Sequence, residues 1–361
     1  MFSIQKITLF QFKNYLKKEF FFDQKVVAVC GMNGSGKTNL LDAIYFLCFT
    51  KSYFNRQDAR IINQGSVGLR LEGNFFKSDA QHEIVAVIRE NNRKEFLIDQ
   101  SEYKKFSEHI GKFPCVMIAP DDVFLITGAS DERRRFIDTI LSQLNPIYLQ
   151  YLIDYSKIVQ QRNSLLKAIN EHQKQDDFLL DTLDDQLIEK GNFIFTERQK
   201  FFATFLPIIQ SSYQTIAQKT DEIVLLYESQ LLHNSFRTLL NQNKQRDIYL
   251  QRTGTGIHKD EIVITMNEQP FKSIASQGQR KSLLFALKLA EFKILQQQKG
   301  FSPILLLDDV FEKLDAKRMH HLLHTVCVEE DAQVFITDTH AERLSEHLVH
   351  LNIPYQLIQL A

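Results

Sequence analysis

The spacing of apolar and polar residues changes character several times along the chain. Residues 4–10 and 19–23 have the pattern of strands, with the polar, basic segment FKNYLKK between them. Residues 26–30, VVAVC, are all apolar and are followed by a glycine-rich segment and then by the helix-like pattern NLLDAIYF. Short β-rich runs separated by polar clusters fill residues 67–98. This first part of the chain therefore predicts a buried strand, a helix and an antiparallel sheet.

The middle of the chain is predicted to be helical. From Asp131 to about Ile209 the apolar residues recur with the period of an α-helix over long segments. The polar, acidic stretch from Glu171 to Asp177 indicates the tip at which one long helix turns back into the next. A short strand at 222–228 and one more helix follow.

The α/β pattern resumes near Gly254. A strand at Glu261–Met266 precedes a long helix, the apolar run ILLLDD, a helix at 315–326 and the strand QVFITDTH. We therefore expect an α/β lobe assembled from both ends of the chain, residues 1–125 and 250–361. Residues 126–249 would form an inserted, mainly helical lobe.

Composition limits the possible classes of protein. The 361 residues include 43 Lys and Arg against 44 Asp and Glu, a net charge of −1, so any nucleic-acid surface must be local. The four cysteines are scattered, which indicates reduced core thiols and neither a zinc site nor a disulfide framework. No apolar run reaches the length of a membrane-spanning helix, and the N-terminus does not have the pattern of a signal peptide. A cytoplasmic protein is expected.

The segment Gly31 to Thr38, GMNGSGKT, fits the phosphate-binding motif G-x-x-x-x-G-K-[ST]. We expect Gly31, Gly34 and Gly36 to adopt positive φ angles and to let backbone N–H groups approach an anion. Lys37 would reach the β- and γ-phosphates and Thr38 would ligate Mg²⁺. An incidental glycine turn is the alternative, but the flanking strand and helix favour a nucleoside triphosphate site. The predicted nucleotide contacts are Gly31, Met32, Asn33, Gly34, Ser35, Gly36, Lys37, Thr38, Asn39 and Lys13.

The run ILLLDD at 304–309 has the features of a Walker B strand. An apolar strand that ends in acidic residues places carboxylates at the edge of the sheet where ligands bind. Asp308 would hold Mg²⁺, and Asp309 would orient or deprotonate the attacking water. With Lys37 they form the predicted catalytic set, although a pair of strand-end caps would have the same sequence. ATP and Mg²⁺ are the expected cofactors.

Ser276-Gln277-Gly278-Gln279 precedes a predicted helix, between the two Walker motifs. A serine and a glycine at a helix N-terminus make an anion-binding end, although a plain N-cap remains the alternative. This is the position of the signature motif of ABC-type ATPases, and here the chain resembles the RecF family, the bacterial recombination mediators among the ABC/SMC-like ATPases. The resemblance rests on FKNY, GMNGSGKTNLLDAIY, PDDVFLITGASDERRRFID, GIHKDEI, IASQGQRKSLLFALKLAE and PILLLDDVFEKLD, in that order.

The resemblance implies the fold and a mechanism. The fold would be an ABC-type P-loop ATPase lobe, with a mixed central sheet, flanking helices and an antiparallel β subdomain, joined to the inserted helical lobe. ATP held by one subunit would be contacted by Ser276, Gly278 and Gln279 of a second, so that ATP drives a homodimer. The dimer would bind DNA at gaps and single-strand to double-strand junctions. With RecO and RecR it would help RecA to load, in recombinational repair, replication restart and SOS induction.

The chain departs from the wider family at three places. Asp309 stands where ABC ATPases carry Glu, which predicts slow, weak DNA-dependent ATP hydrolysis. Glu312-Lys313-Leu314-Asp315 replaces the usual S-E-L-D of the D-loop. Pro120-Asp121 occupies the place of the Q-loop glutamine of SMC-type ATPases, so no Q-loop residue is predicted. His340 is either a switch histidine or a helix cap.

The DNA surface is not determined by the sequence. Arg133, Arg134 and Arg135 are candidates for phosphate contacts, but neighbouring acidic residues make local ion pairs an equal alternative. Lys13, Lys17 and Lys18 form a second possible patch. His258 and Lys259 are interpreted as structural or dimer-related. The alternative functions are the nucleotide-binding subunit of an ABC transporter, a P-loop kinase and an SMC-like scaffold ATPase.

Overall fold

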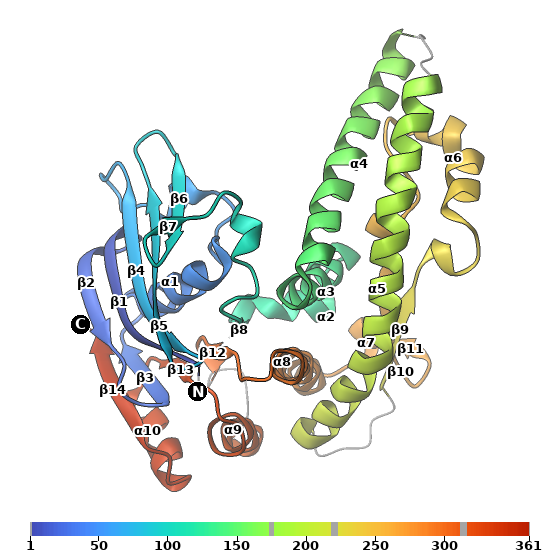
Figure 1. Ribbon diagram of the computed structural model, residues 1–361. Helices are drawn as coiled ribbons and strands as arrows, with labels where there is room; N and C mark the ends of the chain where they lie inside the picture. Colours follow the sequence, from blue (N-terminus) through green and yellow to red (C-terminus); the bar gives the residue numbers. More distant parts are fainter. Residues whose placement is uncertain (1, 173–176, 218–222, 311–315, 361) are drawn as a thin grey trace. The chain divides into compact units, whose positions relative to one another are not determined.

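The computed structural model describes residues 2–172, 177–217, 223–310 and 316–360. Its contacts divide the chain into two compact units, shown with the element labels in Figure 1. The first unit contains residues 1–123, 211–219 and 277–361, and the second contains 124–210 and 220–276.

A five-stranded parallel sheet forms the centre of the first unit. The strand order is β14-β3-β13-β12-β8, and every neighbouring pair is parallel. Their bounds are β3 (Val26–Gly31), β8 (Cys115–Ile118), β12 (Ile304–Leu307), β13 (Val334–Asp338) and β14 (Tyr355–Leu360). All residues of β8, β12 and β13 are buried, as expected for parallel strands covered on both faces. Because the strands are parallel, the residues that follow β3 and β12 lie at the same edge of the sheet.

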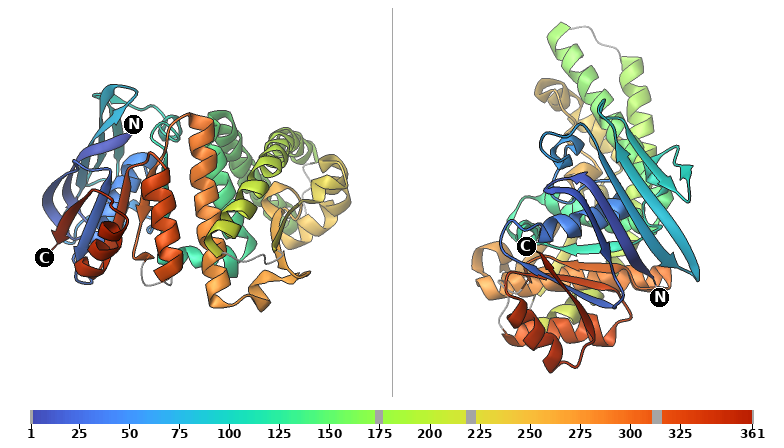
Figure 2. Two further views of the ribbon diagram at one scale, coloured as in Figure 1. Left: turned by 90° about the horizontal axis from the view of Figure 1, so that it is seen from below. Right: turned by 90° about the vertical axis from the view of Figure 1, so that its left-hand side faces the viewer.

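A separate antiparallel sheet of six strands completes the β structure of this unit. The order is β2-β1-β4-β5-β6-β7, and each neighbouring pair is antiparallel. The bounds are β1 (Ser3–Phe12), β2 (Tyr15–Phe21), β4 (Leu69–Lys77), β5 (Ala80–Ile88), β6 (Lys94–Ile98) and β7 (Ser101–Glu102). Figure 2 shows these strands in blue to cyan, with the C-terminal β14 beside β3. The antiparallel directions are thus confined to a sheet of their own.

Helix α1 (Lys37–Phe49) contacts strands of both sheets. Eleven of its 13 residues are buried, so the helix is apolar on nearly every side and belongs to the core. Its side chains share one hydrophobic cluster with β1, β4, β5 and the parallel strands. The remaining helices of this unit are η1 (Asp58–Ile61), η2 (Phe106–Glu108), η3 (Pro120–Val123), α8 (Gln277–Lys299), α9 (Ala316–Leu323), the π-helix η7 (His324–Glu329) and α10 (Ala341–His350).

The second unit is mainly helical. Its long helices are α4 (Pro146–His172) and α5 (Asp177–Ala217), whose rings Tyr151 and Phe193 are 4.3 Å apart between centroids. Residues 173–176 of the predicted helical tip, which runs from Glu171 to Asp177, lie outside the described residues. The other elements are α2 (Phe124–Thr127), α3 (Ser130–Leu144), β9 (Ile223–Glu228), η4 (Gln230–Leu232), α6 (Phe236–Leu250), η5 (Ile257–Lys259), β10 (Glu261–Met266), β11 (Gln269–Pro270) and α7 (Phe271–Ile274).

The compact units differ from the predicted lobes in two segments. Residues 211–219 were expected in the inserted helical lobe, but their contacts group them with the first unit. The first division, at 123/124, lies close to the predicted 125/126. Residues 250–276 were expected in the ATPase lobe, but their contacts group them with the helical unit, because β10 pairs along its whole length with β9. The boundaries of the functional lobes remain a prediction. Among the described residues, no helix has both the length and the apolar character needed to cross a bilayer.

Candidate nucleotide-binding site

The phosphate-loop segment connects β3 to α1, as its motif predicts. Gly34 and Gly36 have φ angles of 85° and 108°, and Gly36 is the N-cap of α1. These positive angles are favourable only for glycine. The expectation of a positive φ was wrong for Gly31. Gly31 is required for a different reason, because a Cβ atom there would lie 2.6 Å from the backbone oxygen of Leu360 in β14.

Lys37 is held over this loop at the start of α1. Its Nζ donates hydrogen bonds to the carbonyl oxygens of Gly31, at 2.8 Å, and Met32, at 3.1 Å. The residue is only 4% exposed, so its ammonium group and the N-terminus of α1 concentrate positive potential at one small site. This is the arrangement that an anion requires.

Asn14, in the turn between β1 and β2, and Tyr15, the first residue of β2, hold the loop in place. The Tyr15 hydroxyl donates to the Gly36 oxygen at 3.1 Å, and the Asn14 amide donates to the Ser35 oxygen at 3.3 Å. The amide of Asn39, a predicted nucleotide contact, donates to Asn14 Oδ1 at 2.8 Å. Burial raises the pKa of Tyr15 well above its usual value, so the phenol remains a donor. The sequence did not predict this role of Asn14 and Tyr15, although both residues belong to the segment FKNY, which contributes to the family resemblance.

Lys13 is engaged elsewhere. Its Nζ lies 2.6 Å from Asp42 Oδ2 in α1, and the two side chains are 11% and 0% exposed. Asp42 also accepts hydrogen bonds from the Ser52 hydroxyl and the Tyr53 backbone N–H, each at 2.7 Å. A buried carboxylate needs such partners. The ion pair competes with the predicted nucleotide contact of Lys13, which stays a prediction.

Asp308 lies directly after β12 and meets the start of α1. The Thr38 hydroxyl is 2.9 Å from Asp308 Oδ1 and 3.0 Å from Oδ2. The hydroxyl of Thr337, in β13, also donates to Asp308 Oδ1 at 2.9 Å. Burial raises the pKa of Asp308 to about 6, against the hydrogen bonds from Thr38 and Thr337, which lower it. The two halves of the predicted site are therefore brought together.

A hydroxyl oxygen beside a carboxylate suits Mg²⁺. Mg²⁺ prefers oxygen ligands and is usually bound by one or two protein groups together with waters and phosphates. Thr38 and Asp308 provide that donor set. The described residues contain no group of three or more His, Cys, Asp or Glu side chains able to hold a metal. Mg²⁺ would neutralise charge on phosphate oxygens there.

Asp309 has an unusual backbone conformation. Its φ is 45°, and its N–H donates to Thr337 Oγ1 at 2.8 Å. The Thr337 hydroxyl thus accepts from Asp309 and donates to Asp308, which fixes the orientation of both residues. The sequence did not identify Thr337. The D-loop segment that follows, residues 312–315, lies outside the described residues.

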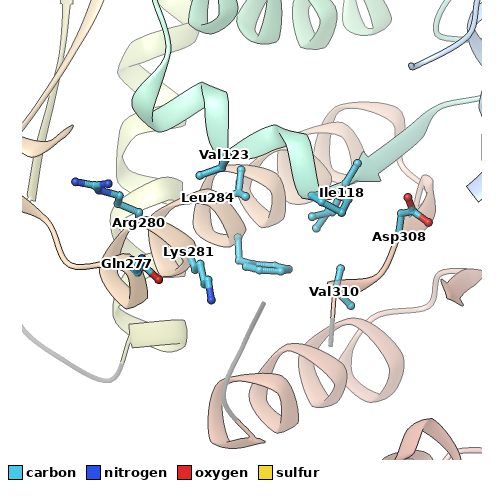
Figure 3. Close-up of a pocket in the computed structure, with 11 residues that line it drawn as sticks. Ile118, Val123, Gln277, Arg280, Lys281, Leu284, Asp308 and Val310 are labelled. Atoms are coloured by element: carbon cyan, nitrogen blue, oxygen red, sulfur yellow. The ribbon is translucent and has the colours of Figure 1, made fainter. Parts of the chain in front are cut away.

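The signature segment begins α8. Ser276 stands immediately before the helix, and Gln277, Gly278 and Gln279 form its first turn, as predicted. Ser276 and Gln277 are exposed. A cavity of about 280 Å³ lies between this end of α8 and η3, with Gln277 and Arg280 at one end and Asp308 at the other (Figure 3).

His340 occupies the N-cap position of α10, but its side chain does not cap the helix. Instead its backbone N–H donates to Asp338 Oδ1 at 2.9 Å, and Arg343 holds the same carboxylate at 2.6 Å. The capping interpretation is therefore wrong for the imidazole. His340 is exposed, and its predicted role as a switch stays a prediction.

The three arginines proposed for DNA form internal contacts in the second unit. Arg133 pairs with Glu261 at 2.9 Å, and Arg134 donates to the backbone oxygen of Asp260 at 2.6 Å. Arg135 pairs with Asp131 at 2.6 Å and Glu132 at 2.8 Å. These distances favour the ion-pair alternative over phosphate binding.

The structural interpretation of His258 is consistent with its contacts. Its ring bonds to the Tyr155 hydroxyl at 2.8 Å and to the Thr253 oxygen at 3.1 Å. Burial lowers the pKa of His258 to about 4, so the ring is neutral near pH 7. Lys259, the next residue, is exposed.

Comparison with known proteins identifies the family. The family model described as RecF/RecN/SMC N terminal domain matches residues 3–356. A protein named DNA replication and repair protein RecF from Parabacteroides distasonis is 42% identical over 357 residues, with 99% of this chain and 97% of that protein covered. A protein of the same name from Flavobacterium johnsoniae is 40% identical, with 99% of both chains covered.

Solved structures agree with this result. The recombination mediator protein RecF-ATP of the RecFOR pathway superimposes with a TM-score of 0.87 and 26% identity, over 94% of this chain and 92% of that one. The Smc head domain from Pyrococcus furiosus matches with a TM-score of 0.55 and 16% identity, over 96% and 92%, which concerns the fold alone. The predicted ABC-type ATPase fold is thereby confirmed. The chain belongs to the RecF family of the RecF/RecN/SMC group.

Proposed function

We propose that this chain is an ATP-dependent DNA-binding protein of recombinational repair and replication restart. Its active form is a homodimer that closes on DNA when ATP is bound. The observation that carries the proposal is the contact of Thr38 with Asp308 beside the buried Lys37. It supports a magnesium–triphosphate site in a chain of the RecF family.

ATP binding is assigned to the segment from Gly31 to Asn39. The N-terminus of α1 and the Lys37 ammonium attract the phosphates, and Thr38 and Asp308 hold Mg²⁺ against their oxygens. The solved RecF-ATP complex, which shares 26% identity with this chain, supports the choice of ATP. Kinase activity toward a small acceptor would not use the signature segment at the start of α8.

Hydrolysis is assigned to Asp309, which orients or deprotonates the attacking water. Its carboxylate is one methylene shorter than the Glu of ordinary ABC ATPases, so turnover is slow. The hydrogen bond from the Asp309 N–H to Thr337 holds the backbone of Asp309 in one orientation, which this role requires. ATP binding then acts as the switch, and hydrolysis ends the closed state. A scaffold that lacks hydrolysis differs from this proposal by releasing no phosphate.

The signature segment acts in the second subunit of the dimer. Exposure of Ser276 and Gln277 leaves them accessible to a partner, which supports a contact in trans with the γ-phosphate. Gly278 and Gln279 add the N–H groups and the amide of the first helical turn. Each of the two ATP molecules would therefore contact both subunits.

DNA binding requires phosphate contacts from residues other than Arg133 to Arg135. In the first unit, Arg56, Arg60, Lys104 and Lys105 are exposed, and within the described part of the chain none has a carboxylate within 4 Å. Lys94 connects the two segments that carry them, because it pairs with Asp58 at 2.8 Å and its Nζ lies 5.4 Å from the Phe106 ring centroid. We assign the phosphate contacts to these cations. The DNA is gapped or carries a single-strand to double-strand junction.

Family membership supports the cellular partners that we propose. RecO and RecR join the ATP-bound dimer and help RecA to load on single-stranded DNA, which supports the SOS response. The protein acts in the cytoplasm. A transporter subunit would instead need a coupling surface for a membrane partner, and neither the family nor the site favours that alternative.

The proposal is tested by measuring DNA binding with and without ATP. Wild-type protein should bind gapped duplex at least tenfold more tightly with Mg-ATP than with Mg-ADP, and Lys37→Met should lose that difference. Affinity should fall as salt rises, since phosphate contacts release counterions. Equal DNA affinity with ATP and ADP would contradict the switch. Affinity that does not depend on salt would contradict the phosphate contacts.

A further inference from the structure

A buried polar cluster ties η3 to the middle of α8 in the first unit. We call Tyr53, Asp122, Lys288 and Glu291 the tie cluster. Lys288 Nζ lies 3.6 Å from Asp122 Oδ2, 3.5 Å from Glu291 Oε2 and 3.3 Å from the Tyr53 hydroxyl. The side chains of Lys288, Asp122 and Glu291 are 5%, 9% and 4% exposed. The Tyr53 hydroxyl also donates to Asp122 Oδ1.

The same cluster connects to the helix that carries Lys37 and Thr38. The Tyr53 backbone N–H donates to Asp42 Oδ1 in α1 at 2.7 Å. Asp122 Oδ2 accepts from the Ala119 N–H at 2.8 Å, which holds η3 against the end of β8. A chain of polar contacts therefore leads from α1 through Asp42, Tyr53, Asp122 and Lys288 to α8.

The first turns of α8 are not packed tightly against η3. The cavity of about 280 Å³ separates them, and its apolar walls include Val123, Leu284 and Phe285 (Figure 3). Lys288 lies one turn beyond Leu284 along α8, past the part of the helix that lines the cavity. The tie cluster thus sets the position of a helix whose beginning has room to shift.

Burying these charges has a free-energy cost, which indicates that the tie cluster does more than fill space in the core. One ammonium and two carboxylates removed from water are destabilising compared with apolar side chains of similar volume. Burial raises the pKa of Glu291 to about 7, against the attraction of Lys288. An apolar cluster would fill the space with less cost, but it would not fix direction and distance as hydrogen-bonded charges do.

We propose that Lys288 is a positioning residue that couples the phosphate-loop helix α1 to the signature helix α8. Through its contacts with Asp122 and Tyr53, Lys288 keeps the start of α8 in the position that lets Ser276 contact the nucleotide of a second subunit. The inference rests on the proposed ATP-dependent dimer. It assigns to Lys288 an effect on dimer closure that is separate from nucleotide binding.

The test uses the full-length variants Lys288→Met, Tyr53→Phe and, as the matched control on the same helix, Lys293→Met. Lys293 is partly exposed and forms no ion pair within the described part of the chain. Nucleotide affinity is measured with a fluorescent ATP analogue, and dimer affinity by sedimentation with and without Mg-ATP. A melting curve for each variant reports folding. Tyr53→Phe removes one hydroxyl only and serves if Lys288→Met does not fold.

Lys288→Met should bind the ATP analogue within about twofold of wild type but lose at least tenfold of the ATP-dependent gain in dimer affinity. Tyr53→Phe should show the same split with a smaller loss, and Lys293→Met should behave as wild type. The inference is overturned if Lys288→Met dimerises with ATP as wild type does. It is also overturned if nucleotide affinity falls in parallel with dimer affinity, because the residue is then only structural. If wild type itself does not dimerise with ATP, the proposed function fails instead.

Discussion

Thr38 and Asp308 are 270 residues apart in sequence, and their side-chain oxygens lie 2.9 Å apart. The contact joins the helix that begins at Lys37 to the strand that ends at Leu307. It exists because β3 and β12 run parallel in one sheet, on either side of β13, so that their carboxyl ends share an edge. The resulting oxygen donors suit Mg²⁺.

Thr337→Val should slow hydrolysis without weakening nucleotide binding. The substitution removes the hydroxyl that accepts from the Asp309 N–H and donates to Asp308. A buried group left without its partner costs about 1–3 kcal/mol, and 1.4 kcal/mol corresponds to a tenfold change in rate. We expect kcat for phosphate release to fall about tenfold, and nucleotide affinity to stay within threefold of wild type. Thr339→Val is the matched control, and an equal change in both variants would contradict the role of Thr337.

Gly36→Ala should disrupt the phosphate loop. A Cβ atom there would lie 2.6 Å from Asn14 Nδ2 and 2.7 Å from the Tyr15 hydroxyl, at a φ of 108°. Gly65→Ala is the control, since its φ is 85° and nothing lies within 4 Å of the added atom. We expect Gly36→Ala to lose ATP binding by more than tenfold and Gly65→Ala to cost only about 1 kcal/mol of stability. Equal ATP affinity of the two variants would show that the loop tolerates the methyl group.

The free energy of unfolding should carry a pH dependence from Glu291. Its pKa is raised from 4.5 in the unfolded chain to about 7 in the fold, chiefly by burial. The folded state then binds the proton more tightly, so this stability is present below pH 4.5 and is lost as the pH rises through 7. The Gln side chain in Glu291→Gln does not titrate. As the pH rises from 4.5 to 7, the free energy of unfolding of this variant relative to wild type should therefore increase, by at most about 3 kcal/mol. Urea unfolding at several pH values measures the difference, and a constant difference would contradict the assignment.

Arg133→Ala should reduce stability and leave DNA binding unchanged. Arg133 pairs with Glu261 and donates to the backbone oxygen of Gly128 at 3.1 Å, so its loss should cost about 1–3 kcal/mol. The double variant Arg56→Ala/Arg60→Ala should instead keep stability and lower DNA affinity. In a plot of log affinity against log salt concentration, the slope for this double variant should also be smaller in magnitude by about two. If Arg133→Ala weakened DNA binding and the double variant did not, the phosphate contacts would instead be assigned to Arg133.

Local patterns were sufficient to predict most elements of the fold. The apolar runs at β3 and β12, the glycine spacing before α1 and the helical periods of α4 and α5 depend on neighbouring residues, and the structure contains them as predicted. The assignment of residues 250–276 depended on pairing instead. β10 joins β9 by a register that no local pattern specifies, and so it groups with the helical unit.

Side-chain partners were harder to predict than motifs. The sequence assigned no role to Thr337, Tyr15 or Lys288, and their contacts appear only when strands and helices from distant segments meet. Lys13 and Arg133 were chosen for their charge, but nearby carboxylates in the fold, Asp42 and Glu261, pair with them. A sequence shows where cations are, whereas packing determines which of them remain available for a ligand.

The central claim, a nucleotide site shared between two subunits, is tested most directly by mixing two variants. Lys37→Met cannot bind ATP productively, and Ser276→Arg cannot contact the ATP of its partner. In a mixed dimer, one of the two sites combines the intact Lys37 of one chain with the intact Ser276 of the other. Sedimentation with Mg-ATP should therefore find monomers for each variant alone and a substantial dimer fraction for the equimolar mixture. A mixture that remains monomeric, or a Ser276→Arg variant that dimerises alone as wild type does, would contradict the shared site.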